Sequence, residues 1–148
     1  MKLSTKGRYG IRALIDLAVN SQNGHVSLVQ IANRNQISLH YLEHVFANLK
    51  KSGIVKSVKG AQGGYTLAEQ PEQITLAQIM LAVEGDFLLE LEESSEDNTA
   101  NAMSEAMNEL LWNCINEETK KILERVTLAD LVQRYTEIAA VGLDMYYI

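Results

Sequence analysis

The sequence contains one cysteine, one proline and no long apolar run. A single cysteine, Cys114, excludes an intrachain disulfide and any metal site built from several cysteines of one chain. A membrane-spanning helix needs about 20 apolar residues, and the N-terminus, MKLSTKGRYG, lacks the apolar core of a signal peptide. We therefore expect a cytoplasmic protein that folds without a metal or a disulfide.

Motifs typical of enzymes are also missing. The sequence shows no nucleophile paired with a general base in a pattern typical of an enzyme active site. The glycine-rich stretch GAQGG, residues 60–64, lies between two short runs rich in strand-forming residues. A phosphate-binding nucleotide loop would instead lead from a strand into a helix. The glycines favour a tight β-hairpin, and we do not expect an enzyme.

Acidic residues are rare in the first half of the chain. Residues 1–66 hold nine Lys/Arg and two Asp/Glu, a net charge of +7, whereas residues 67–148 hold four and seventeen, a net charge of −13. This asymmetry favours a nucleic-acid-binding N-terminal half. Two alternatives stay open. Each half could simply carry solvated surface charge, or the chain could be a protein-interaction module that uses its acidic half.

Three segments with the apolar spacing of helices precede the glycine-rich stretch, and a fourth follows it. They cover residues 5–21, 27–33, 38–52 and 75–85. Ser27, Ser38 and Thr75 are suited to be the N-caps of the last three. Two short helices with a tight connection, followed by a hairpin, are typical of a winged helix-turn-helix. The expected fold is mainly α with a small β-hairpin, and residues 1–85 are expected to form a DNA-binding domain.

The third helical segment carries a polar face opposite its apolar residues. His40, Glu43 and His44 share this face. A glutamate can accept a hydrogen bond from cytosine, a histidine can donate to a purine, and lysines at the helix end and on the hairpin can meet phosphates. An ordinary solvent face is the alternative. His40 and His44 also have a spacing that could hold a metal ion, but no third ligand is near in the sequence, and no metal site is expected.

The acidic half divides into three expected segments: an acidic loop over residues 86–102, a long helix over 103–126, and a short helix with a C-terminal tail over 127–148. The short helix, TLADLVQRY, is expected to fold back on the domain.

The long helix carries an apolar stripe that needs a partner, and a second copy of the chain is the simplest one. The candidate dimer-interface residues are Met103, Met107, Leu110, Leu111, Cys114, Ile115 and Ile122. A homodimer would place two reading helices on a palindromic operator, about 34–36 Å apart.

Four blocks of the sequence resemble the Rrf-type family of bacterial winged-helix transcriptional regulators. They are MKLSTKGRYGIRALIDLA, ISLHYLEHVFANLKKSGIVKSVKGAQGGYTLA, ITLAQIMLAVEGD and TLADLV. The resemblance implies a winged helix-turn-helix that dimerises through the long C-terminal helix and binds double-stranded DNA. The family's DNA-reading positions match Ser38, His40, Tyr41, Glu43 and Lys59. With further residues of the basic half, the candidate DNA-binding residues are Arg8, Ser38, His40, Tyr41, Glu43, His44, Lys51, Lys56, Lys59, Gln62 and Tyr65.

The family resemblance also bears on cofactors. Members that bind an iron–sulfur cluster place three cysteines in the loop after VEGD, where this chain has none. Cluster ligation needs several thiolates or substitutes held together, so we expect no iron–sulfur cluster and no other cofactor. Cys114 is expected to be a small buried apolar residue of the dimer helix. An interchain thiol pair and an oxidation sensor are the alternatives.

The chain ends in DMYYI, which is unusual because exposed termini are normally polar. Within the family, the chain most resembles the cluster-free repressor of cysteine metabolism. Serine acetyltransferases also end in isoleucine and insert that tail into O-acetylserine sulfhydrylase. We therefore expect a docking peptide for that enzyme, made of Met145, Tyr146, Tyr147 and Ile148, with packing on its own dimer as the alternative. The expected function is repression of cysteine or sulfur metabolism genes; another cluster-free redox- or ligand-responsive regulator of the family is the alternative.

Overall fold

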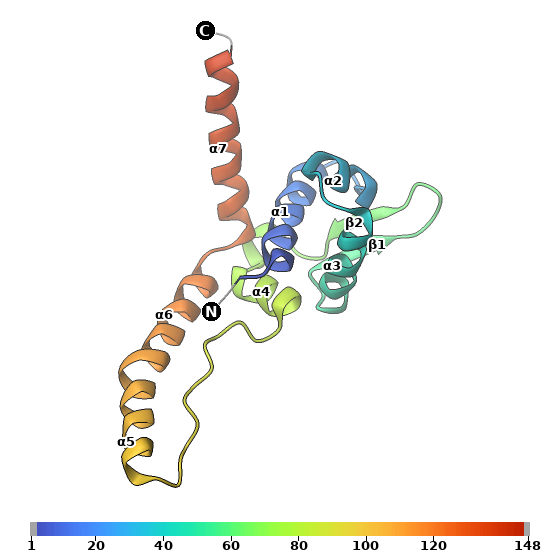
Figure 1. Ribbon diagram of the computed structural model, residues 1–148. Helices are drawn as coiled ribbons and strands as arrows, with labels where there is room; N and C mark the ends of the chain where they lie inside the picture. Colours follow the sequence, from blue (N-terminus) through green and yellow to red (C-terminus); the bar gives the residue numbers. More distant parts are fainter. Residues whose placement is uncertain (1–2, 147–148) are drawn as a thin grey trace.

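The computed structural model describes residues 3–146. Figure 1 shows a mainly helical chain with one hairpin, as the sequence predicts. The elements in chain order are α1 (Thr5–Asn20), α2 (Leu28–Asn35), α3 (Leu39–Lys51), β1 (Val55–Val58), β2 (Gly64–Leu67), the 3₁₀ turn η1 (Pro71–Gln73), α4 (Leu76–Glu84), α5 (Asn98–Met107), the π-helical turn η2 (Asn108–Trp112), α6 (Asn113–Arg125) and α7 (Leu128–Tyr146).

Local side-chain caps set where the short helices begin. The hydroxyl groups of Ser27 and Thr75 accept from the N–H groups of Gln30 and Gln78, and these glutamines return a side-chain oxygen to the cap N–H. Ser38 caps α3 by accepting from the N–H of Tyr41 at 3.2 Å. Such caps are worth about 1 kcal/mol each. They explain why the sequence predicts these three helix starts correctly.

One hydrophobic core joins α1, α2, α3 and α4. Its fully buried side chains include Leu14, Leu17, Ile31, Leu42, Val45, Phe46, Leu49 and Ile79. Burying each of the larger ones contributes about 1.5–3 kcal/mol. Leu128, the first residue of α7, is also fully buried in this core, so the start of α7 is anchored to the N-terminal domain. The core is what holds α3 at a fixed angle to the hairpin.

The hairpin projects from the domain as a wing (Figure 1). Its antiparallel register places Val55 opposite Leu67 and Val58 opposite Gly64. Tyr65 exchanges two backbone hydrogen bonds with Val26, at 2.9 and 2.8 Å, in an isolated antiparallel bridge beside the pair. The backbone of Val26 comes so close to Gly64 that a Cβ there would collide with its carbonyl group. A glycine is therefore required where the hairpin meets the chain before α2.

The C-terminal half departs from the sequence-based expectation in two places. The long helix begins at Asn98, not near residue 102, because the carboxylate of Asp97 accepts from the N–H groups of Thr99 and Ala100. The helix after Thr127 is not short, since α7 runs for 19 residues. Its first turn lies on the domain, but from Tyr135 onward its large apolar side chains are 50–75% exposed. Figure 1 shows α7 continuing away from the domain, so only its start folds back.

Candidate nucleic-acid interface

The face of α3 that the sequence singles out is exposed. Ser38, His40, Glu43 and His44 all lie on the surface, while Leu42, Val45, Phe46 and Leu49 are buried on the opposite side. Because Ser38 caps the helix, the free N–H groups of its first turn are held in place at the same surface. The side of α3 that is not used by the core is therefore the side that carries hydrogen-bonding groups.

Two histidines contact each other on this face. The Nε2 atoms of His40 and His44 are 3.3 Å apart, and the two rings meet edge to face with centroids 4.7 Å apart. The Nδ1 atom of His40 lies 3.8 Å from the carboxylate of Glu43. These three side chains thus form one cluster on successive turns of α3.

Tyr41 and Tyr65 differ from the other candidates because both are half-buried against the core. Tyr41 packs edge to face on Tyr9 with centroids 5.7 Å apart, and Tyr65 packs on Phe46 at 5.0 Å. Desolvation, and to a lesser extent the nearby Glu84 carboxylate, raises the pKa of Tyr41 above its ordinary value.

The wing carries the remaining candidates. Lys56 lies on β1, and Lys59 and Gln62 lie in the turn that follows, all three exposed. The ring Nε2 of His25 contacts the carbonyl oxygen of Gln62. Sequence reasoning missed His25, because its partner is 37 residues away and no local pattern points to it. This contact braces the wing tip against the chain that precedes α2.

Arg8 lies at the surface near the start of α1, and a residue from α4 fixes that helix end. Oε1 of Glu84 accepts from the backbone N–H groups of Ser4 at 3.1 Å and Gly7 at 2.9 Å, and from the hydroxyl of Ser4. The first turn of α1 has no acidic residue of its own. Glu84 thus supplies the negative charge that a helix N-terminus favours. No local sequence pattern marks this contact, because its partners are 77 and 80 residues apart.

An ion pair ties α2 to α1. The guanidinium of Arg34 donates to both oxygens of Asp16, at 2.6 Å from its terminal nitrogen and 3.0 Å from Nε. Asn35 donates to the same carboxylate at 2.8 Å. The hydrogen bond to Asp16 raises the pKa of Arg34, although partial desolvation opposes it. Two-pronged pairs of this kind fix orientation as well as distance.

The seven candidate dimer-interface residues are all exposed in the single chain. They lie along α5, η2 and α6, and Leu110 is the most exposed of the large ones at 75%. Cys114 is exposed too, and its thiol donates to the carbonyl oxygen of Glu109 at 3.2 Å. The predicted burial of Cys114 thus has no support within one chain.

The acidic segment before the long helix is ordered by asparagines. We call residues 86–97 the acidic strap; Figure 1 shows it running back along α6, η2 and α5. The side-chain amide of Asn116 exchanges two hydrogen bonds with the backbone of Leu89, at 2.8 and 2.9 Å. Asn108 does the same with Glu92, at 2.8 and 3.1 Å. The sequence predicts only an acidic loop here, and neither contact was expected.

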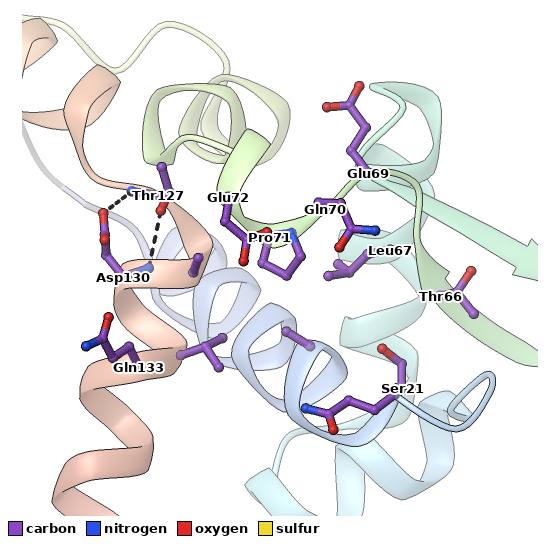
Figure 2. Close-up of a pocket in the computed structure, with 14 residues that line it drawn as sticks. Ser21, Thr66, Leu67, Glu69, Gln70, Pro71, Glu72, Thr127, Asp130 and Gln133 are labelled. Carbon is purple, nitrogen blue, oxygen red and sulfur yellow. Dashed lines mark hydrogen bonds between the residues drawn. The ribbon is translucent and has the colours of Figure 1, made fainter.

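A cavity of about 890 Å³ lies on the domain, between α1, η1 and the start of α7. Figure 2 shows Glu69, Gln70 and Gln133 around it. The carboxylate of Asp130, also on its wall, accepts from the N–H of Thr127 at 2.9 Å and thereby caps α7. None of the candidate DNA-binding residues lines this cavity.

The sequence also bears on membrane-spanning helices and on a docking segment at the C-terminus. Within residues 3–146, no helix has the length and apolar content needed to cross a membrane. Met145 lies at the end of α7 and is exposed, and Tyr146 is its last residue. Tyr147 and Ile148 lie outside the described residues. The docking tail therefore stays a prediction.

Comparison with known proteins identifies the family. The Rrf2 family model, described as an iron-dependent transcriptional regulator, matches residues 3–134. The chain is 40% identical over 141 residues to the HTH-type transcriptional regulator CymR of Bacillus subtilis, covering 93% of both. The solved structure of B. subtilis CymR, the global cysteine regulator, matches with a TM-score of 0.75 and 37% identity, over 90% of this chain and 98% of that one. The structure of T. potens IscR matches with a TM-score of 0.73 and 38% identity, over 93% and 90%. The chain belongs to the Rrf2 family of DNA-binding, helix-turn-helix transcriptional regulators.

Proposed function

We propose that this regulator is a homodimeric repressor of cysteine or sulfur metabolism genes that reads a palindromic operator with α3 and the wing. The observation that carries the proposal is the likeness to CymR, the global cysteine regulator of B. subtilis, with 40% identity over 93% of both chains. The exposed groups on α3 and the wing support the DNA-reading part. A different cluster-free regulator of the same family is the competing function.

The proposed reading mode follows from the exposed groups. In the major groove, Glu43 accepts from a cytosine amine, and His40 and His44 meet purine acceptors. Lys51 at the end of α3 and Arg8 neutralise phosphates, as do Lys56 and Lys59 on the wing, with Gln62 at its tip. The half-buried rings of Tyr41 and Tyr65 pack on Tyr9 and Phe46 and so support this surface from below. Together, the contacts from α3 and from the wing of one chain would cover one half-site of the operator.

The proposed dimer rests on the exposed apolar side chains of α5, η2 and α6. Seven neighbouring apolar residues are exposed to water in the single chain, although burying each of them would contribute favourable free energy. A helix stripe of this kind suits pairing with its own copy, because one two-fold contact buries the set twice. Two copies of α3 then face two half-sites of a palindrome.

The proposed signal enters through a protein partner and not through a metal cluster. The acidic strap contains no cysteine and no histidine, so it offers carboxylates and backbone groups but no soft ligand for iron. We assign the C-terminal segment 145–148 as the docking peptide for O-acetylserine sulfhydrylase. Met145 at its start is exposed, which leaves it open to a partner.

The experiment is operator binding by the purified protein, measured with and without O-acetylserine sulfhydrylase. The salt dependence of the affinity counts phosphate contacts, and a slope that reflects several of them supports DNA reading. Tighter binding with the enzyme, relieved by O-acetylserine, supports the cysteine-metabolism role. A variant that lacks Ile148 is the matched control, because it should still bind the operator and ignore the enzyme. Operator binding indifferent to the enzyme in both proteins would contradict the proposed signal and favour another regulator of the family.

A further inference from the structure

The histidine pair on α3 has the geometry of a metal chelate. His40 and His44 are one helical turn apart, and their Nε2 atoms approach to 3.3 Å. Both side chains are exposed, with His40 at 82%, so neither ring is held by the core. The two nitrogens therefore converge because of their position on the helix, and the rings are free to turn.

The separation of these nitrogens can be compared with that in a zinc site. Two Zn–N bonds of 2.0–2.1 Å at a tetrahedral angle place the nitrogens about 3.3–3.4 Å apart. The observed 3.3 Å fits this value. In the metal-free pair one ring N–H donates to the other ring, whereas a metal ion needs both lone pairs. Both rings are exposed, so binding a metal ion requires them to turn from the edge-to-face arrangement until both lone pairs point at the ion.

A glutamate lies on the Nδ1 side of His40. A histidine that binds a metal through Nε2 keeps its proton on Nδ1, and this proton usually meets a carboxylate or carbonyl. The Nδ1 atom of His40 faces the carboxylate of Glu43 at 3.8 Å. At 3.8 Å this contact is longer than a hydrogen bond, so Glu43 contributes negative charge beside the ring and does not fix its orientation.

We propose that His40 and His44 form a two-ligand site for a divalent ion such as zinc or copper, with water in the other coordination positions. Among residues 3–146 no group of three or more His, Cys, Asp or Glu is placed to hold a metal, so the protein supplies only this pair. A site with two protein ligands is open and exchanges its metal. It lies on α3 and uses histidines, whereas the cluster-binding members of the family place cysteines in the loop after VEGD.

A bound ion would change how α3 meets DNA. It occupies the Nε2 atoms that otherwise read bases, and it adds positive charge that any phosphate backbone attracts. Specific contacts are lost while non-specific attraction grows. The metal therefore lowers the ratio of operator affinity to random-sequence affinity. This second step rests on the proposed function, whereas the binding of metal does not.

The first test is metal binding by the untagged protein, measured by zinc titration calorimetry at constant pH. One ion per chain is expected, and His40→Gln and His44→Gln should each weaken binding at least about tenfold, since even outer partners of a metal site are worth that much. His25→Gln is the matched control, and Cys114→Ser excludes the exposed thiol as a ligand. Both should bind like the unaltered chain. Equal zinc affinity in His44→Gln, or loss in Cys114→Ser, would overturn the site.

The second test compares operator and random duplexes with and without zinc. The affinity ratio of the unaltered chain should fall about fivefold or more, because good base contacts discriminate by at least that factor. The ratio of His44→Gln should not respond to zinc. A ratio that zinc leaves unchanged in the unaltered chain, despite measured zinc binding, would overturn the effect on DNA reading. Failure to bind any operator would refute the proposed function and leave the zinc titration valid.

Discussion

Replacing Asn116 with alanine tests whether asparagines hold the acidic strap to the long helix. Asn116 is 8% exposed, and its amide makes both hydrogen bonds that the backbone of Leu89 offers at this point. Alanine is compatible with the helix, so the change removes the amide without breaking α6. The variant therefore isolates the contact between strap and helix.

The magnitude follows from two lost hydrogen bonds. A typical hydrogen bond contributes a net ~0.5–1.5 kcal/mol, so the pair is worth about 1–3 kcal/mol. The upper end applies if the N–H and C=O of Leu89 stay buried without partners. The lower end applies if the strap lifts and water takes the place of the amide. The same substitution at Asn108, which is less buried, should cost less.

Urea unfolding gives the free energy, and amide hydrogen exchange gives the location. Protein concentration must be held fixed, because the stability of an assembling protein depends on it. The amide of Leu89 should exchange faster in Asn116→Ala, whereas the buried core amides of α3 should not. Asn113→Ala is the matched control, since Asn113 is exposed on the same helix. Equal stability of the two variants within about 0.5 kcal/mol would refute the reasoning.

Three further changes test other parts of the molecule. Glu84→Gln weakens the cap on α1 and should lower the free energy of unfolding by about 1–2 kcal/mol, measured by thermal unfolding, whereas exposed Glu90→Gln should change it by less than about 0.5 kcal/mol. Lys59→Ala should lower the slope of log affinity against log salt by about 0.9, and Lys120→Ala, in the acidic half, should leave that slope unchanged. Leu110→Glu places a charge in the proposed dimer stripe and should shift sedimentation toward the monomer without unfolding the domain; an unchanged dimer would contradict that interface.

Features carried by neighbouring residues were predictable from the sequence. Ser27, Ser38 and Thr75 cap helices through groups three residues away, so the starts of α2, α3 and α4 follow from short stretches. The hairpin follows in the same way from its glycines. The polar face of α3 was predictable because helical spacing alone separates His40 and His44 from the buried residues.

Contacts between distant residues were not predictable in this way. Glu84 caps a helix 77 to 80 residues earlier in the chain, and nothing near either partner marks the pair. The asparagines of the long helix bind backbone groups, which carry no sequence signal of their own. The length of α7 was missed because its large apolar residues from Tyr135 to Met145 are exposed in the single chain, so they resembled a tail more than a helix.

The π-helical turn η2 explains why the strap fits the long helix. Successive asparagines that face the strap are Asn101, Asn108 and Asn116, separated by seven and then eight residues. Seven residues of a regular α-helix end about 20° short of two full turns, whereas eight would overshoot by about 80° at 3.6 residues per turn. The π turn between Asn108 and Trp112 takes in one extra residue and so brings Asn116 back into line with Asn108. An extended strap that advances three residues per contact, at about 3.3 Å each, covers the same length as two helical turns. The extra residue therefore keeps the polar face toward the strap and leaves the apolar face of the same helix free.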